Sequence, residues 1–197
     1  MSEFTAIRAV TQTLKEILEA HITNSSEPEL NGVPIDLRSP REMRGNAQPS
    51  FGISLWLYQV ARNADLLNHP PERPAPDRVL RHALPIDLYY LVTPLASAPI
   101  DEQALMGRVL QVFNDHPTLR GSDLRDSLQN TPVELRLILE APSLEELTRV
   151  WHALQEPYQL SVTYLVQVLS IHSDLEPVQS SPVAVRETEY DQILAVT

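Results

Sequence analysis

Cysteine is absent from the 197 residues of this chain. Its absence excludes disulfides, thiolate metal sites and cysteine nucleophiles, and it is typical of a protein that folds in a reducing cytosol. Glycine is scarce, and the five glycines stand alone at positions 32, 45, 52, 107 and 121. The sequence therefore contains no glycine-rich loop that would cradle a phosphate.

Long apolar runs are also missing. No stretch of about 18 apolar residues occurs, so we expect no membrane-spanning helix and no membrane partner. The first ten residues carry Glu3 and Thr5 where a secretory signal needs an apolar core. We therefore expect the protein to be assembled in the cytoplasm.

Basic charge is in deficit. The chain has 26 acidic and 15 basic residues, which gives a net charge of −11, and Lys15 is its single lysine. Nucleic-acid binding depends on clustered Lys and Arg that displace counterions from phosphates. This composition predicts that nucleic acid is not a partner.

Three segments repeat apolar residues at helical spacing: 3–20, 101–114 and 143–154. Ser2 is a candidate N-cap for the first helix, and Phe4 belongs to its apolar stripe. Ser143 and Glu146 form a capping box at the start of the third helix, and Leu144 opens its apolar stripe. We expect each helix to bury one face.

Five segments have the composition or alternation of strands: 33–37, 51–60, 84–93, 133–140 and 160–172. The segment 51–60 carries bulky side chains on both faces, which predicts a central strand covered on each side. The order of helices and strands predicts an α/β (α+β) fold: a single mixed β-sheet flanked by two to three helices. The segment 174–197 loses periodicity, so we predict one domain over 1–173 and an extended C-terminal arm over 174–197.

No side-chain pattern typical of catalysis is present. The six histidines, at 21, 69, 82, 116, 152 and 172, are scattered singly, so we expect no metal site and no cofactor. Ser, His and Asp all occur, but no G-x-S-x-G turn supports a hydrolase. Asp87 lies inside an apolar strand, where it is either a general base or, as we favour, faces the less apolar side or pairs with an arginine. We predict no catalytic residue.

The irregular segments hold the candidates for an interface. The RSPREMRGN segment spaces three arginines evenly, either as a solvated loop or as a docking loop that grips carboxylates of a partner. A proline-rich loop is either a plain connector or a stiff contact surface. The C-terminal arm contains a short apolar alternation that is able to pair with a sheet edge of this subunit or a neighbour. The candidate residues are Arg38, Arg41, Arg44, Pro70, Pro71, Pro74, Val183, Val185 and Arg186.

The order of these segments resembles the family named for the N-terminal domain of the cap protein of extracellular contractile injection systems. The resemblance covers about residues 3–172. The matching segments are FTAIRAVTQTLKEIL, ISLWLYQVARNADLLN, LPIDLYYLVTPLA, DEQALMGRVLQVFNDHPTL, VELRLILEAPSLEELTRVWHAL and PYQLSVTYLVQVLSI. None of them is an active-site signature, so the resemblance depends on their order and pattern.

The resemblance implies a phage tail-terminator-like fold and a structural role. Such proteins form a hexameric ring that closes the inner tube and the sheath, so the implied partners are further copies of the chain, the tube protein and the sheath protein. Many relatives have a longer C-terminal extension, whereas this chain stops at Thr197. An adaptor or baseplate component of the same particle is therefore the alternative, and a small hydrolase is the second alternative.

Overall fold

The computed structural model describes residues 4–45, 51–68, 73, 75 and 77–179. The α-helices are α1 (Ala6–Leu18), α2 (Pro40–Arg44), α3 (Pro99–Asp115) and α4 (Leu144–Ala153). The strands are β1 (Ile35–Asp36), β2 (Gly52–Arg62), β3 (Arg78–Val79), β4 (Leu84–Leu95), β5 (Thr118–Arg120), β6 (Glu134–Glu140), β7 (Val162–Ile171) and β8 (Val178–Gln179). Short turns of other helix types are η1 (Glu19–Thr23), η2 (Asp65–Asn68), η3 (Gly121–Asp123) and η4 (Asp126–Leu128).

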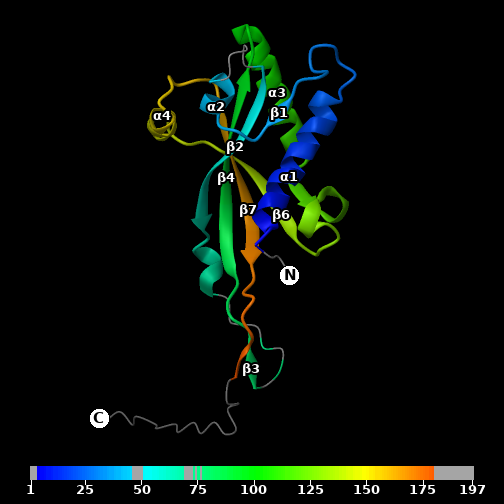
Figure 1. Ribbon diagram of the computed structural model, residues 1–197, viewed down its shortest axis with the longest axis vertical. Helices are drawn as coiled ribbons and strands as arrows, with labels where there is room; N and C mark the ends of the chain where they lie inside the picture. The colour runs from blue at the N-terminus through cyan, green and yellow to red at the C-terminus, as the bar shows by residue number, and fades with distance from the viewer. Residues whose placement is uncertain (1–3, 46–50, 69–72, 74, 76, 180–197) are drawn as a thin grey trace, which may run out of the picture.

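Six strands form one mixed sheet in the order β1-β2-β4-β7-β6-β5 (Figure 1). The β1–β2 pair is parallel, and the other neighbours are antiparallel. The predicted mixed sheet with helices packed on it is confirmed. A separate pair, β3 and β8, lies beyond the lower end of the main sheet in Figure 1 and was not predicted.

The two faces of the sheet carry two apolar clusters of unequal size. On β4, Leu88 and Tyr90 belong to the large cluster, which also contains the buried side chains of α1 and α3. Leu91 points to the other face, where it packs with Trp151 and Leu154 at the C-terminal end of α4. Because successive side chains of a strand alternate between faces, β4 contributes to both clusters.

The first helix packs its apolar stripe on the sheet as predicted. Val10, Leu14 and Leu18 are fully buried, and the hydroxyls of Thr11 and Tyr90 lie 2.7 Å apart, which links the helix to β4. The assignment of Phe4 to the buried stripe is wrong. This side chain is 81% exposed because it precedes the first turn of the helix. The predicted cap, Ser2, lies outside the described residues.

The capping box of α4 is confirmed. The backbone N–H of Glu146 donates to the Ser143 hydroxyl at 3.3 Å, and the Ser143 N–H donates to the Glu146 carboxylate at 2.8 Å. The Ser143 hydroxyl also donates to this carboxylate at 2.8 Å, and that hydrogen bond, together with the one from the Ser143 N–H, holds the pKa of the Glu146 carboxyl below its ordinary value. Leu144 is 65% exposed, so its predicted burial is wrong, and the apolar stripe is covered only from Leu147 onward.

The parallel contact between β1 and β2 depends on a close backbone approach at Gly52. The residue has φ +134°, and a Cβ there would lie 2.6 Å from the carbonyl oxygen of Pro34. That same oxygen accepts a hydrogen bond from the N–H of Ile53 at 2.9 Å. A side chain at position 52 would therefore separate the two strands.

Candidate interaction surfaces

Asp87, the one carboxylate inside an apolar strand, is held by an amide. Its side chain is 8% exposed, and the Asn63 side-chain N–H₂ donates to both carboxylate oxygens at 3.1 Å. Of the two alternatives favoured from the sequence, pairing with an arginine is not found among the described residues, where the partner of the carboxylate is this amide. The oxygen of the same amide accepts the backbone N–H groups of Asp65 and Leu66, so Asn63 joins the turn after β2 to β4. Asp87 therefore has a structural partner and lines none of the hollows described below.

Two histidines that are far apart in the sequence lie together in the fold. The rings of His21 and His116 have centroids 5.1 Å apart, and Nδ1 of His116 lies 2.8 Å from the carbonyl oxygen of Val112. Sequence reasoning missed this pair because the two residues come from the ends of different helices. Among the described residues, no group of three or more His, Cys, Asp and Glu side chains is placed to hold a metal ion.

The three evenly spaced arginines are engaged within the chain. Arg38 forms a fork with Asp36, with Nη2 2.5 Å from the carboxylate, and this guanidinium lowers the pKa of the Asp36 carboxyl. Arg41 donates from Nη1 to the carbonyl oxygen of Leu154 at 3.2 Å and to the Gln155 side chain at 2.9 Å. Arg44 donates to the Gln159 side chain. Two of the interface candidates, Arg41 and Arg44, therefore already fasten α2 to the connection between α4 and β7.

The segment expected to be a continuous loop contains the short helix α2. Ser39 and Glu42 form a second capping box, in which the Glu42 N–H donates to the Ser39 hydroxyl at 3.3 Å. Pro40 occupies the first turn, where a missing N–H costs nothing. The S-x-x-E pattern at Ser39 is the same as the one at Ser143, so it was the signal in the sequence that indicates this helix.

The remaining interface candidates lie outside the described residues: Pro70, Pro71, Pro74, Val183, Val185 and Arg186. Their proposed roles stay predictions. The described neighbours of both groups meet in the β3–β8 pair, where Arg78 lies opposite Gln179 and Val79 lies opposite Val178. The described strands β3 and β8, which follow the proline-rich loop and begin the C-terminal arm, therefore lie together at one end of the molecule (Figure 1).

One edge of the sheet is open over most of its length. β1 pairs with β2 only at Ile53 and Ser54, and within the described residues no strand pairs with the outer side of β2 from Leu55 to Arg62. Exposure rises along the strand, and Val60 is 48% exposed. Unpaired edge strands are the usual places where a second chain adds a strand.

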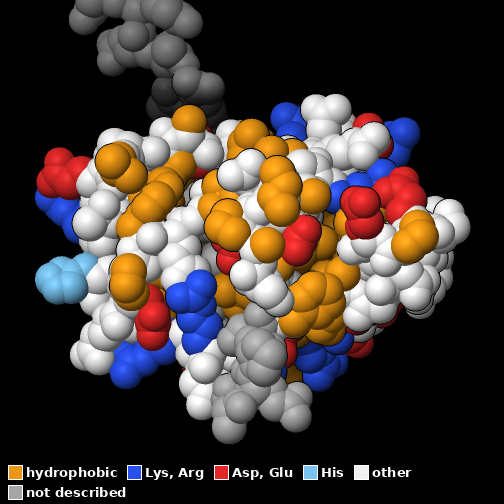
Figure 2. Space-filling model, turned by 90° about the horizontal axis from the view of Figure 1, so that it is seen from above, with side chains coloured by type: hydrophobic (Ala, Val, Ile, Leu, Met, Phe, Trp, Pro, Cys, Tyr) orange, Lys and Arg blue, Asp and Glu red, His pale blue; other side chains and the backbone are white. Residues whose placement is uncertain are grey.

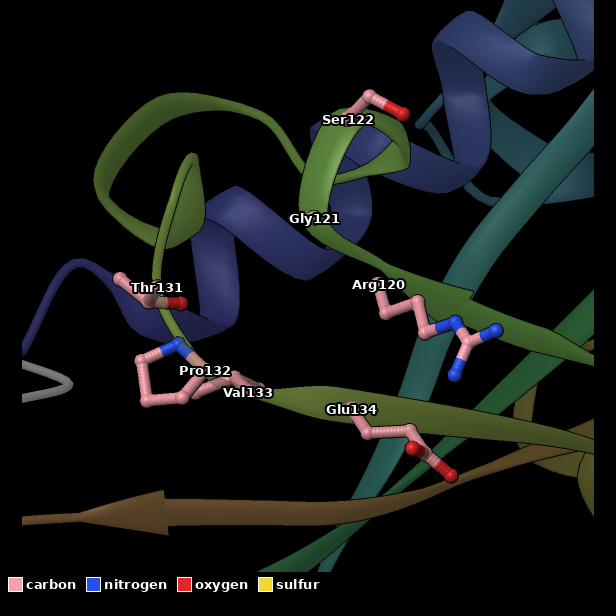
Figure 3. A pocket seen from close by; sticks show the side chains of 7 residues that line it. All are labelled: Arg120, Gly121, Ser122, Thr131, Pro132, Val133 and Glu134. Carbon is pink, nitrogen blue, oxygen red and sulfur yellow. The ribbon is translucent and has the colours of Figure 1, made fainter.

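The hollow shown in Figure 3 lies between β5 and the start of β6. Arg120 and Glu134 face each other in the β5–β6 ladder and point to the same side, while the hydroxyl of Ser122 points away from them. The Thr131 hydroxyl donates to the carbonyl oxygen of Leu128 at 2.7 Å. No hydroxyl in this hollow is placed next to a base, so the arrangement lacks the parts of a nucleophilic site.

A second hollow, beneath the N-terminal half of α4, is more polar. Its lining includes Tyr58 and Tyr89, whose hydroxyl pKa values burial raises above the ordinary range. Of the three charged side chains there, Glu146 caps α4 and Arg149 contacts Glu145 at 2.6 Å, while Glu140 lies at the end of β6. The raised pKa values keep both tyrosine hydroxyls protonated near neutral pH.

No helix among the described residues is long and apolar enough to cross a membrane. The molecule has a sheet with an open edge, a projecting strand pair and exposed apolar side chains at its ends. Such features are typical of chains that assemble with other chains.

Comparison with known proteins gives consistent matches. The family model described as the Pvc16 N-terminal domain matches residues 9–184. One solved structure is the PVC sheath/tube terminator of an extracellular contractile injection system in the extended state; it has a TM-score of 0.65 at 19% identity, over 100% of this chain and 67% of that one. Another is the anti-feeding prophage cap (AFP tube terminating cap), with a TM-score of 0.62 at 20% identity over 92% of this chain and 60% of that one. Among curated proteins, none matches this chain.

Proposed function

Because the chain belongs to the Pvc16 N-terminal domain family, we propose that it terminates the inner tube and the sheath of a phage-tail-like contractile injection particle. The observation that carries this proposal is the shared fold, which extends over the whole chain to a sheath/tube terminator and over 92% of it to a tube terminating cap. The role is structural. The supporting observation is that Asp87, the carboxylate considered as a general base, is held within the fold by the side-chain amide of Asn63.

The terminator works as a homo-oligomeric ring, which we propose to be a hexamer. A ring is built from head-to-tail contacts that close by rotation, so each subunit needs two different contact surfaces. The open edge of β2 and the projecting β3–β8 pair supply distinct surfaces of this kind. The ring contacts the inner tube protein and the sheath protein, without nucleic acid or membrane, and it is assembled in the cytoplasm.

The segments proposed to make these contacts are 38–48, 64–80 and the chain after Ser173. In the first of them, Arg38 and Arg44 are exposed although both are hydrogen-bonded within the chain. Guanidinium groups keep free N–H donors after one such contact, because each has five. These arginines are therefore able to bind carboxylates of a partner while Arg38 stays paired with Asp36 and Arg44 fastens α2.

Electron microscopy of particles from a deletion strain tests the proposal. Without a terminator, tubes and sheaths should have irregular lengths, and the intact gene supplied in trans should restore uniform particles. A near absence of particles would instead favour a baseplate component. Particles of normal length would contradict the proposal.

The mass of the purified protein, alone and mixed with the tube protein, tests the ring. We expect the mass of a hexamer in at least the mixed sample. A monomer in both samples would contradict the homo-oligomeric ring and leave the adaptor role as the better explanation.

A further inference from the structure

The hollow beneath the N-terminal half of α4 brings together side chains from four strands of the main sheet. Its lining includes Tyr58 of β2, Tyr89 of β4, Glu140 of β6 and Thr163 of β7, so we call it the tyrosine hollow. Glu140 lies directly opposite Thr163 in the β6–β7 ladder, and the sheet therefore fixes their positions. The volume is about 510 Å³, within the roughly 300–1,000 Å³ typical of binding sites.

The tyrosine hollow contains hydrogen-bond acceptors that the fold leaves unused. The Glu140 carboxylate and the Tyr89 hydroxyl make no hydrogen bond and no ion pair with another described residue. Thr163 is 2% exposed, and its hydroxyl also has no hydrogen-bond partner among the described residues, although it lies close enough to the Tyr58 hydroxyl to offset part of the rise in its pKa. An occupant should therefore supply several donors.

The charges that line the tyrosine hollow sum to a negative value. Glu140 and Glu146 are two carboxylates against the single guanidinium of Arg149, which itself contacts Glu145 at 2.6 Å. Glu145 and Glu146 lie in the first turn of α4, where they offset the positive end of the helix dipole. The carboxylate of Glu140 remains without a partner, so the occupant should be a cation.

Two aromatic rings are placed to contact this cation. The ring centroids of Tyr58 and Tyr89 lie 6.3 Å apart with the rings in an edge arrangement. Besides burial, the negative charges of Asp87 and Glu140 raise the pKa of Tyr89, which shows that a negative potential reaches the ring. Aromatic faces and a nearby carboxylate together favour a cation that stacks while it donates hydrogen bonds.

A guanidinium fits this lining better than an ammonium. It has five N–H donors in one plane, which stacks on rings and binds a carboxylate through two parallel hydrogen bonds. Arginine is also the basic side chain that a copy of this chain is able to supply, because Lys15 is the single lysine and already pairs with Glu19 at 3.4 Å.

Other exposed apolar surface does not define its occupant in this way. Figure 2 shows hydrophobic side chains in the middle of the surface at the end of the molecule where β2 begins, with acidic ones among them. A hollow at this end has a volume of about 200 Å³, and its lining includes Leu30, Phe51 and Leu105. Apolar walls accept many side chains, so this end does not indicate the chemistry of a partner.

We propose that the tyrosine hollow of one copy binds an arginine side chain of the neighbouring copy. The guanidinium stacks on the tyrosine rings and donates to the Glu140 carboxylate. The hollow begins at a surface already proposed for the ring contact, because Tyr58 and Gln59 belong to β2, whose outer edge is open. This inference rests on the ring proposed above and names the chemical group that joins two copies at that edge.

A small probe tests the chemistry of the tyrosine hollow. Nα-acetyl-arginine amide, titrated into the purified chain, should give saturable NMR shifts of the backbone amides around positions 58, 89 and 140. Nα-acetyl-citrulline amide has nearly the same shape without the charge and should bind at least tenfold more weakly. Glu140→Gln should weaken binding of the arginine probe at least tenfold, whereas Glu134→Gln, a carboxylate of the same strand outside the hollow, should not. Absence of saturable shifts, equal binding of the two probes or equal binding by the two variants would overturn the proposal.

Sedimentation velocity tests whether the cation comes from a neighbouring copy. We expect Glu140→Gln to lower the fraction of oligomer at least tenfold and Glu134→Gln to leave it unchanged, with circular dichroism showing that both variants are folded. Unchanged oligomer in Glu140→Gln would overturn this contact and leave the ring proposal intact; the hollow would then belong to a free guanidinium compound if the probe binds. If the unmodified chain forms no oligomer, alone or with the tube protein, the ring proposal and this contact both fail.

Discussion

The side-chain amide of Asn63 donates hydrogen bonds to both carboxylate oxygens of Asp87, each at 3.1 Å, in a buried position between β2 and β4. The backbone N–H of Asn63 also donates to the carbonyl oxygen of Pro85 at 3.0 Å. One residue therefore closes the end of β2 and satisfies a carboxylate that an apolar strand would otherwise leave without a partner.

Asn63→Ala should destabilise the fold. It removes both hydrogen bonds to the Asp87 carboxylate, and leaving a buried acceptor unsatisfied costs about 1–3 kcal/mol of unfolding free energy. Chemical denaturation measures the change. Asn114→Ala, at an exposed position of α3, is the matched control and should change stability by less than about 0.5 kcal/mol. Equal stability of both variants would show that the Asp87 carboxylate does not depend on this amide.

Arg41→Ala should loosen the connection between α4 and β7. Its guanidinium donates to Leu154 and Gln155, and the loss of such hydrogen bonds typically costs about 0.5–1.5 kcal/mol. We expect faster amide hydrogen exchange over residues 154–160, whereas exchange in the strands of the sheet should stay unchanged. Arg149→Ala, whose ion pair lies within α4, is the control. A variant with unchanged exchange that fails to assemble would instead assign Arg41 to the interface alone.

Tyr164 should make the fold sensitive to alkali. Burial raises the pKa of its hydroxyl to about 12, compared with 10.0 for an unperturbed tyrosine. Because the folded state holds this proton more tightly than the unfolded state, its contribution to stability is complete below about pH 10 and is lost as the pH rises toward 12. Tyr164→Phe should make the unfolding free energy depend less on pH in this range. Tyr158→Phe, at an exposed tyrosine, should leave the pH dependence unchanged. Unfolding free energies measured across this range provide the check.

Truncation at Asp174 should leave a folded monomer that no longer forms rings. The main sheet keeps all six strands because β7 ends at Ile171, while β8 and the C-terminal arm are removed. Sedimentation velocity and circular dichroism report mass and folding together. A second truncation that removes only 180–197 keeps β8 and separates its contribution from that of the remaining arm. A hexamer from the shorter chain would refute the role of the arm.

Periodicity predicted the longer elements, because each has enough residues to show an apolar face. Helical spacing of apolar residues predicted the positions of α1, α3 and α4. Alternation of apolar residues predicted the positions of β2, β4, β6 and β7. Most of the short elements were missed, although β1 lies within the strand predicted over 33–37. Those of two or three residues, such as β5, carry no measurable period, and α2 is marked only by its capping box.

Contacts between distant residues could not be predicted in the same way. His21 and His116 lie 95 positions apart, and only the packing of α1 beside α3 brings their rings together. The same holds for the partners of Arg41 and Arg44, which are more than 100 positions away. An arginine side chain is expected to bind oxygen atoms. Only the folded structure shows that the oxygen atoms bound here belong to the same chain.

The large apolar cluster draws its members from Ala6 to Leu169, so the order of synthesis matters. During translation, α1 leaves the ribosome well before β7, which is one of the elements that it packs against. Part of the apolar face of α1 therefore stays uncovered until β7 has emerged. We expect these contacts between distant parts of the sequence to slow folding.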